Sequence, residues 1–194
     1  MLKRILAACL LGLAFAIPAQ ATSVLPLYLD EIVDQSAVVF QGVCMENRSA
    51  RDPATGMIVT YTTFQVVDKL KGAVGATHTI KQIGGELPGE RVGFKIQSVP
   101  TFAVGESYVV FLAGVSQAGF SSPIGLGQGR FTVVARPGGL EVTNGRDFKE
   151  LTSRIAPETM TKSARSALAG SGSVNHFPLE DLKNIVRQRA GAAQ

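Results

Sequence analysis

The sequence predicts a mainly β protein, a closed barrel or sandwich of short antiparallel strands with a short helix before it and a helical tail after it. Six or seven runs rich in β-branched and aromatic residues follow one another between positions 38 and 143. Turn residues separate these runs, and no stretch of helical periodicity lies between them. A βαβ fold, in which helices alternate with strands, is therefore not expected.

The first 21 residues have the organisation of a secretory signal peptide. Lys3 and Arg4 form a basic start, residues 5–16 carry no charge, and residues 19–21 read Ala-Gln-Ala, a small-x-small cleavage site. The apolar run is too short for a mature transmembrane helix, which needs about 20 residues.

We therefore expect cleavage between Ala21 and Thr22. The mature protein is then periplasmic or secreted and has no stable membrane anchor. An alternative is lipidation of Cys9 in a lipobox-like Leu-Ala-Ala-Cys at residues 6–9, but this would leave an apolar core of only about four residues.

Charge and ligand-type residues exclude several function classes. The net charge is +4 at pH 7, and loss of the two basic leader residues lowers it to +2, too little for a nucleic-acid footprint. Loss of Cys9 leaves Cys44 alone, so no intrachain disulfide is expected and the thiol is predicted to be buried and inert. With two His in the chain, we expect no metal site and no other cofactor.

The first elements are a helix and two long strands. Residues 25–36 predict a short helix, with Asp30 and Glu31 suited to its first turn. Residues 38–45 form a near-continuous apolar run that predicts a strand with a buried face, and residues 57–67 predict a second one. The turn between them, rich in Pro, Asp and Gly, makes the two strands antiparallel.

The later strands are separated by glycine and proline pairs. The run around Val110 is the most apolar, so we expect this residue in the core of the sheet. The further strands are expected at residues 77–83, 91–99, 107–113, 129–136 and 140–143.

The predicted organisation is a signal peptide (1–21), a β domain (22–145) and a helical tail (146–194). Residues 163–174 are rich in Ala, Ser and Gly and predict a flexible linker. A last helix starts at Pro178. Its apolar stripe consists of Leu179, Leu182, Ile185 and Val186.

Two interpretations of this stripe remain open. It docks on the body of the protein, or it forms a partner-binding face for another exported protein. From Met160 onward the chain carries five basic and two acidic residues, whereas residues 22–159 have a net charge of −1. This complementarity favours docking, and we expect a monomer.

No catalytic motif is present in the sequence. His-Glu-x-x-His, Gly-x-Ser-x-Gly, a P-loop and Cys-x-x-Cys are all absent, and His78 and His176 lie in separate stretches. Residues 125–130 superficially look like a phosphate loop, but Arg130 replaces the third glycine and a strand follows instead of a helix. We interpret these glycines as sites of close backbone approach or a bulge.

Several segments together carry a resemblance to known proteins: LDEIV (29–33), VVFQGV (38–43), YTTFQVVDKLKG (61–72), PTFAVGESYVVFL (100–112) and GLGQGRF (125–131). They resemble a group of uncharacterised exported bacterial proteins, over residues 25–134 and the last helix. Residues 38–72 are also similar to the netrin-like module of the tissue inhibitors of metalloproteinases. That similarity implies a five-stranded barrel of the oligonucleotide/oligosaccharide-binding (OB-like) type.

The functional expectation is an exported, non-enzymatic binding or accessory module with an unknown ligand. The alternatives are a hydrolase that uses dispersed residues and a netrin-like protease inhibitor. The netrin-like inhibitors place a disulfide-tethered N-terminal Cys against the catalytic zinc, whereas the predicted mature chain begins at Thr22 and has no partner for Cys44. Inhibition by that route is therefore not expected.

Overall fold

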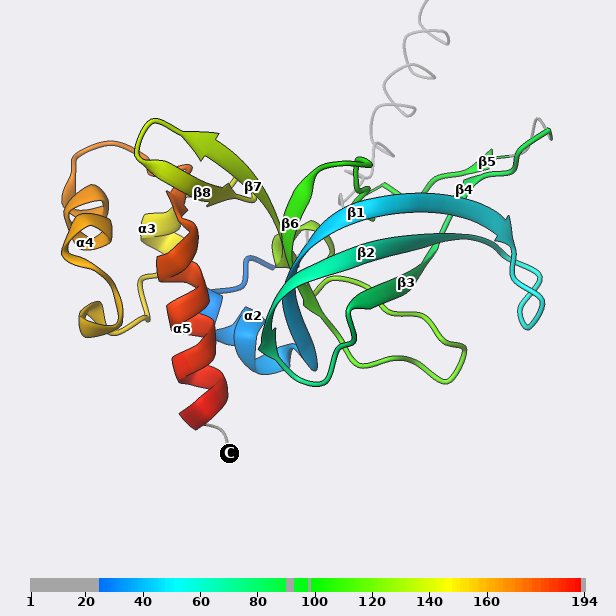
Figure 1. Ribbon diagram of the computed structural model, residues 1–194, viewed down its shortest axis with the longest axis horizontal. Helices are drawn as coiled ribbons and strands as arrows, with labels where there is room; N and C mark the ends of the chain where they lie inside the picture. Colours follow the sequence, from blue (N-terminus) through cyan, green and yellow to red (C-terminus); the bar gives the residue numbers. More distant parts are fainter. Residues whose placement is uncertain (1–24, 90–92, 98, 193–194) are drawn as a thin grey trace, which may run out of the picture.

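The computed structural model describes residues 25–89, 93–97 and 99–192. The predicted signal peptide, with its cleavage site at Ala21 and Thr22, lies outside the described residues. The main feature is a seven-stranded antiparallel sheet in the order β3-β2-β1-β6-β7-β8-β9 (Figure 1). Its strands are β1 (Val38–Arg51), β2 (Ile58–Lys71), β3 (Thr77–Ile83), β6 (Ser107–Leu112), β7 (Arg130–Arg136), β8 (Gly139–Thr143) and β9 (Phe177–Pro178).

Helices pack against this sheet, and a two-stranded hairpin forms a second, separately hydrogen-bonded sheet. The hairpin pairs β4 (Gly85–Glu86) with β5 (Gly93–Phe94). Among the described residues, no helix has the length and apolar character needed to cross a membrane. The helices are α2 (Leu29–Gln35), α3 (Phe148–Leu151), α4 (Lys162–Ala169), α5 (Leu179–Ala192) and the 3₁₀ turns η1 (Leu126–Gly129) and η2 (Pro157–Thr159).

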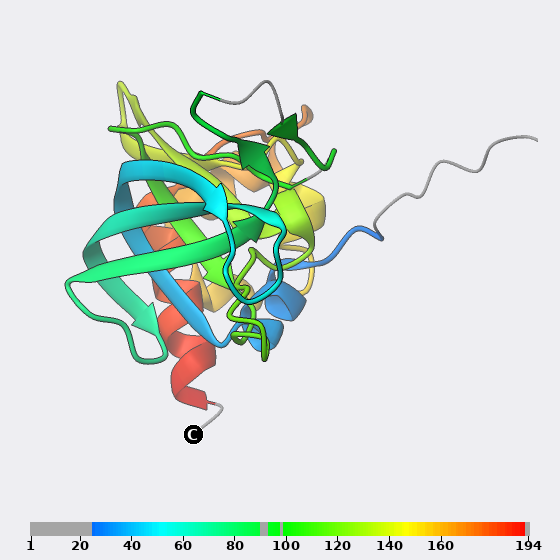
Figure 2. The same cartoon turned by 90° about the vertical axis from the view of Figure 1, so that its right-hand side faces the viewer.

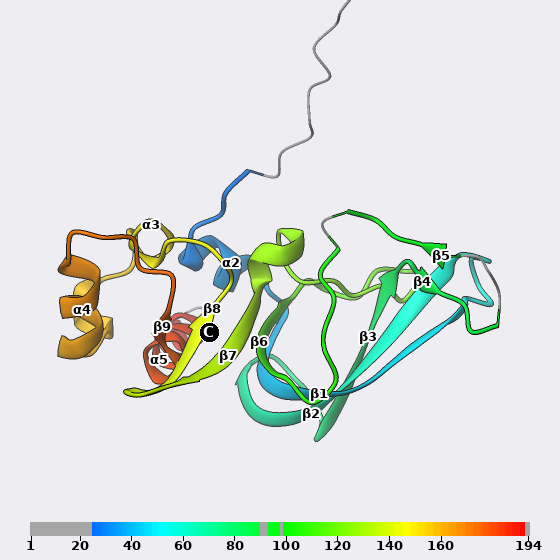
Figure 3. The ribbon, with the colours of Figure 1, turned by 90° about the horizontal axis from the view of Figure 1, so that it is seen from above.

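Four strands form a Greek key. β1, β2 and β3 follow one another as antiparallel neighbours, and β6 returns to pair with β1 on its other side. The segment that makes this return, residues 84–106, is called the crossover below. Register shifts in β1 near Gln41 and Cys44 mark irregularities that bend the strand, and the three-stranded part is strongly curled (Figures 1 and 3).

Two apolar clusters hold the fold together. The larger one packs α2, α3 and α5 against the sheet around β7 and β8. The smaller one fills the curl, where Phe64 meets Phe40 and Phe102 edge-to-face at centroid distances of 5.5 and 4.9 Å, and Tyr108 continues the row. Seen from the curled end, β1, β2 and β3 cross in front and α5 lies behind them (Figure 2). Val110 is buried in the smaller cluster, as predicted.

The structure confirms a mainly β protein with a short helix before the sheet and a helix at its end. The first helix begins at Leu29, because the backbone amide of Tyr28 donates to the Glu31 carboxylate at 2.9 Å and caps it there. The two long strands extend further than predicted, to Arg51 and Lys71.

Two predicted elements are wrong. In the range 91–99, only Gly93 and Phe94 of the described residues form a strand, and the described residues 95–97 and 99 are not paired in a sheet. The predicted linker at residues 163–174 instead begins within the helix α4, which the Thr161 hydroxyl caps by accepting from the amide of Ala164 at 3.2 Å. Alanine-rich composition favours helix once such a cap and a buried contact are available.

Candidate functional site

A cavity of about 460 Å³ lies at the far end of the curl, between the three-stranded meander and the crossover. Its floor belongs to the sheet and is polar, whereas its opposite wall belongs to the crossover and is mostly apolar. The floor contains Asn47, Thr60, Thr62 and Gln82, and the wall contains Phe94, Ile96, Val99, Pro100, Thr101 and Phe102.

The alternation of side chains along β2 produces the polar floor. Phe64 faces the inside of the curl, so Thr62 and Thr60, two and four residues earlier, face the same way. In the register of the sheet, Asn47 lies opposite Thr62, and Gln82 lies opposite Thr60. The concave face therefore changes from aromatic at Phe64 to polar at Thr62, the next inward-facing residue of β2.

Hydrogen bonds order the floor. The Thr62 hydroxyl donates to the Asn47 Oδ1 atom at 2.6 Å, and the Thr60 hydroxyl donates to the carbonyl oxygen of Gly84 at 2.7 Å. Since a threonine hydroxyl has only one proton, the 3.1 Å contact between Ser49 and Thr60 must be donated by Ser49. The floor is thus a fixed set of uncharged groups.

Three side chains from three strands fix the wall. The carbonyls of three consecutive residues accept hydrogen bonds: Pro100 from Gln82 at 3.3 Å, Thr101 from Arg130 at 2.6 Å and Phe102 from Asn47 at 2.7 Å. An extended segment outside the sheet ladder has no strand partner for its carbonyls, and these side chains satisfy them instead. Gln82 and Asn47 therefore belong to the floor and also hold the wall above it.

Glycines make the turn into the crossover possible. Gly84 and Gly85 have φ angles of +98° and +141°, which side-chain-bearing residues rarely adopt. A Cβ atom at Gly84 would lie 2.7 Å from the carbonyl oxygen of Phe94, and one at Gly85 would collide with the hydroxyls of Ser49 and Thr60. The two glycines thus let the β4–β5 hairpin approach the floor closely.

The rim of the cavity carries its charges. Glu86 and Lys95 are both exposed and line the opening, where Phe94 leaves 48 % of its surface accessible to solvent. No charged residue lies in the floor described above. The site therefore offers an exposed aromatic ring and two solvated charges outside, and neutral polar groups inside.

An ion pair on the outer side of the curl supports this region. Lys81 donates to Asp52 at 2.7 Å and to the carbonyl oxygen of Ala118 at 2.7 Å, and its ammonium lies 4.6 Å from the Phe120 ring centroid. The hydrogen bond from Lys81, together with that from Thr55, lowers the pKa of Asp52. The pair connects the β1–β2 turn to the loop before β7, and it is a structural contact.

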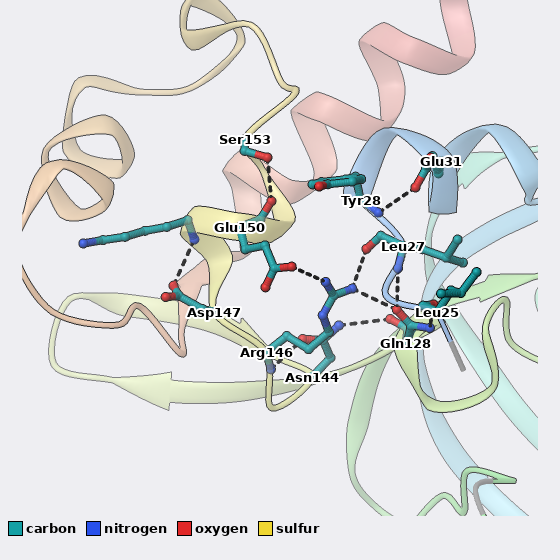
Figure 4. A network of polar contacts seen from close by, with 11 residues as sticks. Leu25, Leu27, Tyr28, Glu31, Gln128, Asn144, Arg146, Asp147, Glu150 and Ser153 are labelled. Carbon is teal, nitrogen blue, oxygen red and sulfur yellow. Dashed lines mark hydrogen bonds and ion pairs between the residues drawn. The ribbon is translucent and has the colours of Figure 1, made fainter. Parts of the chain in front are cut away.

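The glycine-rich segment 125–130 binds the start of the described chain. The Gln128 amide donates to the carbonyl oxygen of Leu25 at 3.0 Å and accepts from the backbone amide of Leu27 at 2.8 Å (Figure 4). Arg146 donates to the carbonyl of Leu27 and to the Gln128 side chain. At Gly129 a Cβ atom would lie 2.8 Å from the backbone of Ile124, so the expected close backbone approach is confirmed there, whereas at Gly127 the space is open.

The four residues considered as a partner-binding face lie in the core. Leu179, Leu182, Ile185 and Val186 are buried, with exposed fractions of at most 2 %, in the larger cluster. The docking interpretation is therefore confirmed, and the partner-face interpretation of these side chains is wrong, because their own protein covers them.

Ion pairs fix the helix α5 on both sides. Lys183 and Arg187 contact Asp68 of β2 at 3.1 and 2.7 Å, and Arg189 binds Asp34 of α2 through two hydrogen bonds of 2.6 Å. Burial raises the pKa of Asp68, but the hydrogen bonds from Lys183 and Arg187 outweigh it and lower the pKa overall. Basic residues of the tail thus form ion pairs with acidic residues of the body.

Among the described residues, no catalytic partner contacts His78, His176 or Cys44. The His78 ring packs on Phe40 at a centroid distance of 5.3 Å, and burial lowers its pKa. His176 lies 3.0 Å from Arg136, and burial raises the pKa of the Cys44 thiol. Within the described ranges no three His, Cys, Asp or Glu side chains gather in a way that could hold a metal ion.

No protein-family model, curated protein or solved structure matches this chain. The cavity itself was not predicted from the sequence. Its signal was present, however, because Asn47, Thr60, Thr62 and Gln82 are polar residues at inward positions of strands that are otherwise apolar inside.

Proposed function

We propose that this chain is a non-enzymatic binding module, exported from a bacterial cell to the periplasm or the medium, and that the cavity under the crossover is its binding site. The carrying observation is the two-sided lining of the cavity, with ordered neutral polar groups on one side and apolar side chains on the other. Small-molecule sites commonly combine an apolar enclosure with a few fixed polar groups.

The size of the cavity supports this proposal. A volume of about 460 Å³ lies within the range of about 300–1,000 Å³ that is usual for small-molecule sites. The buried polar groups of the floor also have a cost, because the same strand positions filled with aliphatic residues would extend the aromatic core. A binding role explains why polar residues occupy them.

The Greek key supports a relation to OB-like modules, which we propose as the architecture of the curled half. An OB-like domain is a partly open five-stranded Greek-key barrel. The strands β1, β2, β3 and β6 provide the key, and β7 is the fifth strand. Contacts between β3 and β7 in solution, measured as cross-strand nuclear Overhauser effects, would establish closure, and their absence would reject it.

A matched pair of tryptophan substitutions tests the binding site. Val99 lines the cavity, whereas Val104 is 61 % exposed on the same crossover. We expect Val99→Trp to fill the cavity and Val104→Trp to leave it open. A fragment library is titrated into the ¹⁵N-labelled wild type and both variants, and binding is followed by amide chemical shifts.

Fragments that shift resonances of cavity residues in the wild type and in Val104→Trp, but not in Val99→Trp, would support the proposal. Two results would refute it: fragments that bind elsewhere on the surface and leave the cavity resonances unchanged, or equal binding to both variants. Folding of each variant is checked from the dispersion of the same spectra.

A further inference from the structure

The hydroxyl groups of the cavity floor have already used their protons. Thr62 donates to Asn47, Thr60 donates to the carbonyl of Gly84, and Ser49 donates to Thr60. Each hydroxyl has a single proton but two lone pairs. Toward a ligand, Thr60 and Thr62 therefore act as acceptors, whereas Ser49 is not among the residues that line the cavity.

Asn47 is also saturated. Its Nδ2 atom donates to the carbonyl of Phe102 at 2.7 Å and lies 3.8 Å from the Cys44 sulfur, and its Oδ1 atom accepts from Thr62. Both amide protons and the carbonyl of this side chain thus have partners inside the protein. It shapes the floor without offering a free donor.

Gln82 differs from its neighbours in the floor. Only 3 % of the residue is exposed, its side chain lines the cavity, and its Nε2 atom donates one N–H to the Pro100 carbonyl. Because the Pro100 carbonyl can only accept a hydrogen bond, the NH₂ end of the Gln82 side chain must face it, and the Oε1 end points away. Among the described residues, no hydrogen bond engages the Oε1 atom or the second N–H of this side chain.

The side-chain amide of Gln82 thus has one acceptor, its carbonyl, and one donor, its second N–H, without hydrogen-bond partners in the described part of the chain. The Oε1 atom is not among the described side-chain atoms that are fully buried without a partner, so it is accessible inside the cavity, and a ligand that pairs with both groups replaces water at this edge. A carboxamide or peptide group has one N–H and one carbonyl and complements this edge. A carboxylate has acceptors only, so it can pair with the N–H of Gln82 but leaves the Oε1 atom unpaired, and the ammonium of Lys95 in the lining is exposed to solvent at the rim.

Building on the proposed function, we propose that the cavity binds an uncharged amide with an apolar body, such as a short aliphatic peptide segment, through the side-chain amide of Gln82. The apolar body packs against Ile96, Val99 and Phe102 of the wall. The remaining acceptors of the floor, at Thr60 and Thr62, favour ligands with additional N–H or O–H donors.

Two probes of nearly the same shape test this inference: 4-methylpentanamide, which is neutral, and 4-methylpentanoate, which is a carboxylate at pH 7 and contains no amide. Each is titrated into the ¹⁵N-labelled protein, with the side-chain NH₂ signals of Gln82 as the local reporter. For a ligand of this size we expect a Kd of about 1 mM for the amide. The carboxylate should bind at least about ten-fold more weakly, which corresponds to one lost hydrogen-bonded pair.

The variant Gln82→Leu removes the amide edge at similar volume and should weaken binding of the neutral probe by about ten-fold. Its control is Gln65→Leu, which changes an exposed glutamine on the same sheet and should bind like the wild type. The comparison of the two probes on the wild type stands independently of whether Gln82→Leu folds.

The outcomes separate this inference from the proposed function. Equal or tighter binding of the carboxylate, or an unchanged affinity in folded Gln82→Leu, would overturn the inference while the cavity remains a binding site. The same holds if neither probe binds but library fragments still distinguish Val99→Trp from Val104→Trp. If nothing binds in the cavity, both proposals are wrong.

Discussion

Replacing Leu182 by alanine is a direct test of whether α5 belongs to the core. The side chain of Leu182 is fully buried in the larger cluster, and the ion pairs of Asp68 and Asp34 hold the helix on both sides. The surroundings can therefore collapse only partly into the space left by the missing atoms. Alanine retains helix propensity, so the loss is one of packing. We expect the free energy of unfolding to fall by about 3 kcal/mol.

Urea unfolding followed by far-ultraviolet circular dichroism measures this change. With a slope of about 2 kcal/mol per molar urea for a domain of this size, the midpoint should fall by about 1.5 M. The matched control is Leu140→Ala on β8, where the side chain is 52 % exposed and the change should stay below about 0.5 kcal/mol. An unchanged midpoint and slope for Leu182→Ala would mean that the helix does not pack on the sheet in solution.

Three further predictions concern the core, the acid stability and the N-terminus. Val110→Asp buries an unpaired carboxylate and should cost about 4 kcal/mol, which a thermal melt would register as a strongly lowered Tm; an unchanged Tm would contradict the burial of β6. The lowered pKa of Asp68 stabilises the fold above the unfolded-state value of about 3.9, and this contribution disappears as the pH falls through the folded-state pKa. Asp68→Asn should therefore lower the free energy of unfolding by about 1–2 kcal/mol at neutral pH. The variant should also lose less of this free energy than the wild type as the pH falls below about 5, as measured by urea unfolding at several pH values. A pH profile parallel to that of the wild type would reject the role of this pair. Intact-mass measurement of the exported protein should give a chain that begins at Thr22, and a mass that includes Met1 or a lipid on Cys9 would exclude the predicted cleavage.

Strand positions were predictable because burial imposes a period of two on β-branched and aromatic residues. The third strand at residues 77–83 follows from this alternation, whereas the strand around Val110 follows from a continuous apolar run, because both of its faces are buried. The docking of α5 was also predictable from its apolar stripe and from the opposite charges of tail and body. In these cases local composition and tertiary packing require the same structure.

The crossover could not be predicted, for a physical reason. Residues 95–97 and 99–102 contain Ile, Val and Phe, which predict a strand. Their conformation, however, is held by hydrogen bonds from side chains of distant strands and not by pairing with a neighbouring strand. The helix α4 was missed because a composition of small residues is compatible with both a linker and a helix. The helix forms here because Thr161 caps it and Ala164 is buried, and neither feature can be seen in the composition. The cavity floor was missed because polar residues in a strand also suit a solvent-facing position.

The three clamped carbonyls at Pro100, Thr101 and Phe102 link ligand binding to folding. Their partners lie 18, 29 and 55 residues away along the chain and on three different strands, so the wall becomes ordered only when all three strands are in place. A partly folded meander of β1, β2 and β3 has the floor but no enclosed site. Since a ligand of the cavity then binds the native state alone, saturation at about 100 times its Kd would stabilise the whole protein by about 2.7 kcal/mol.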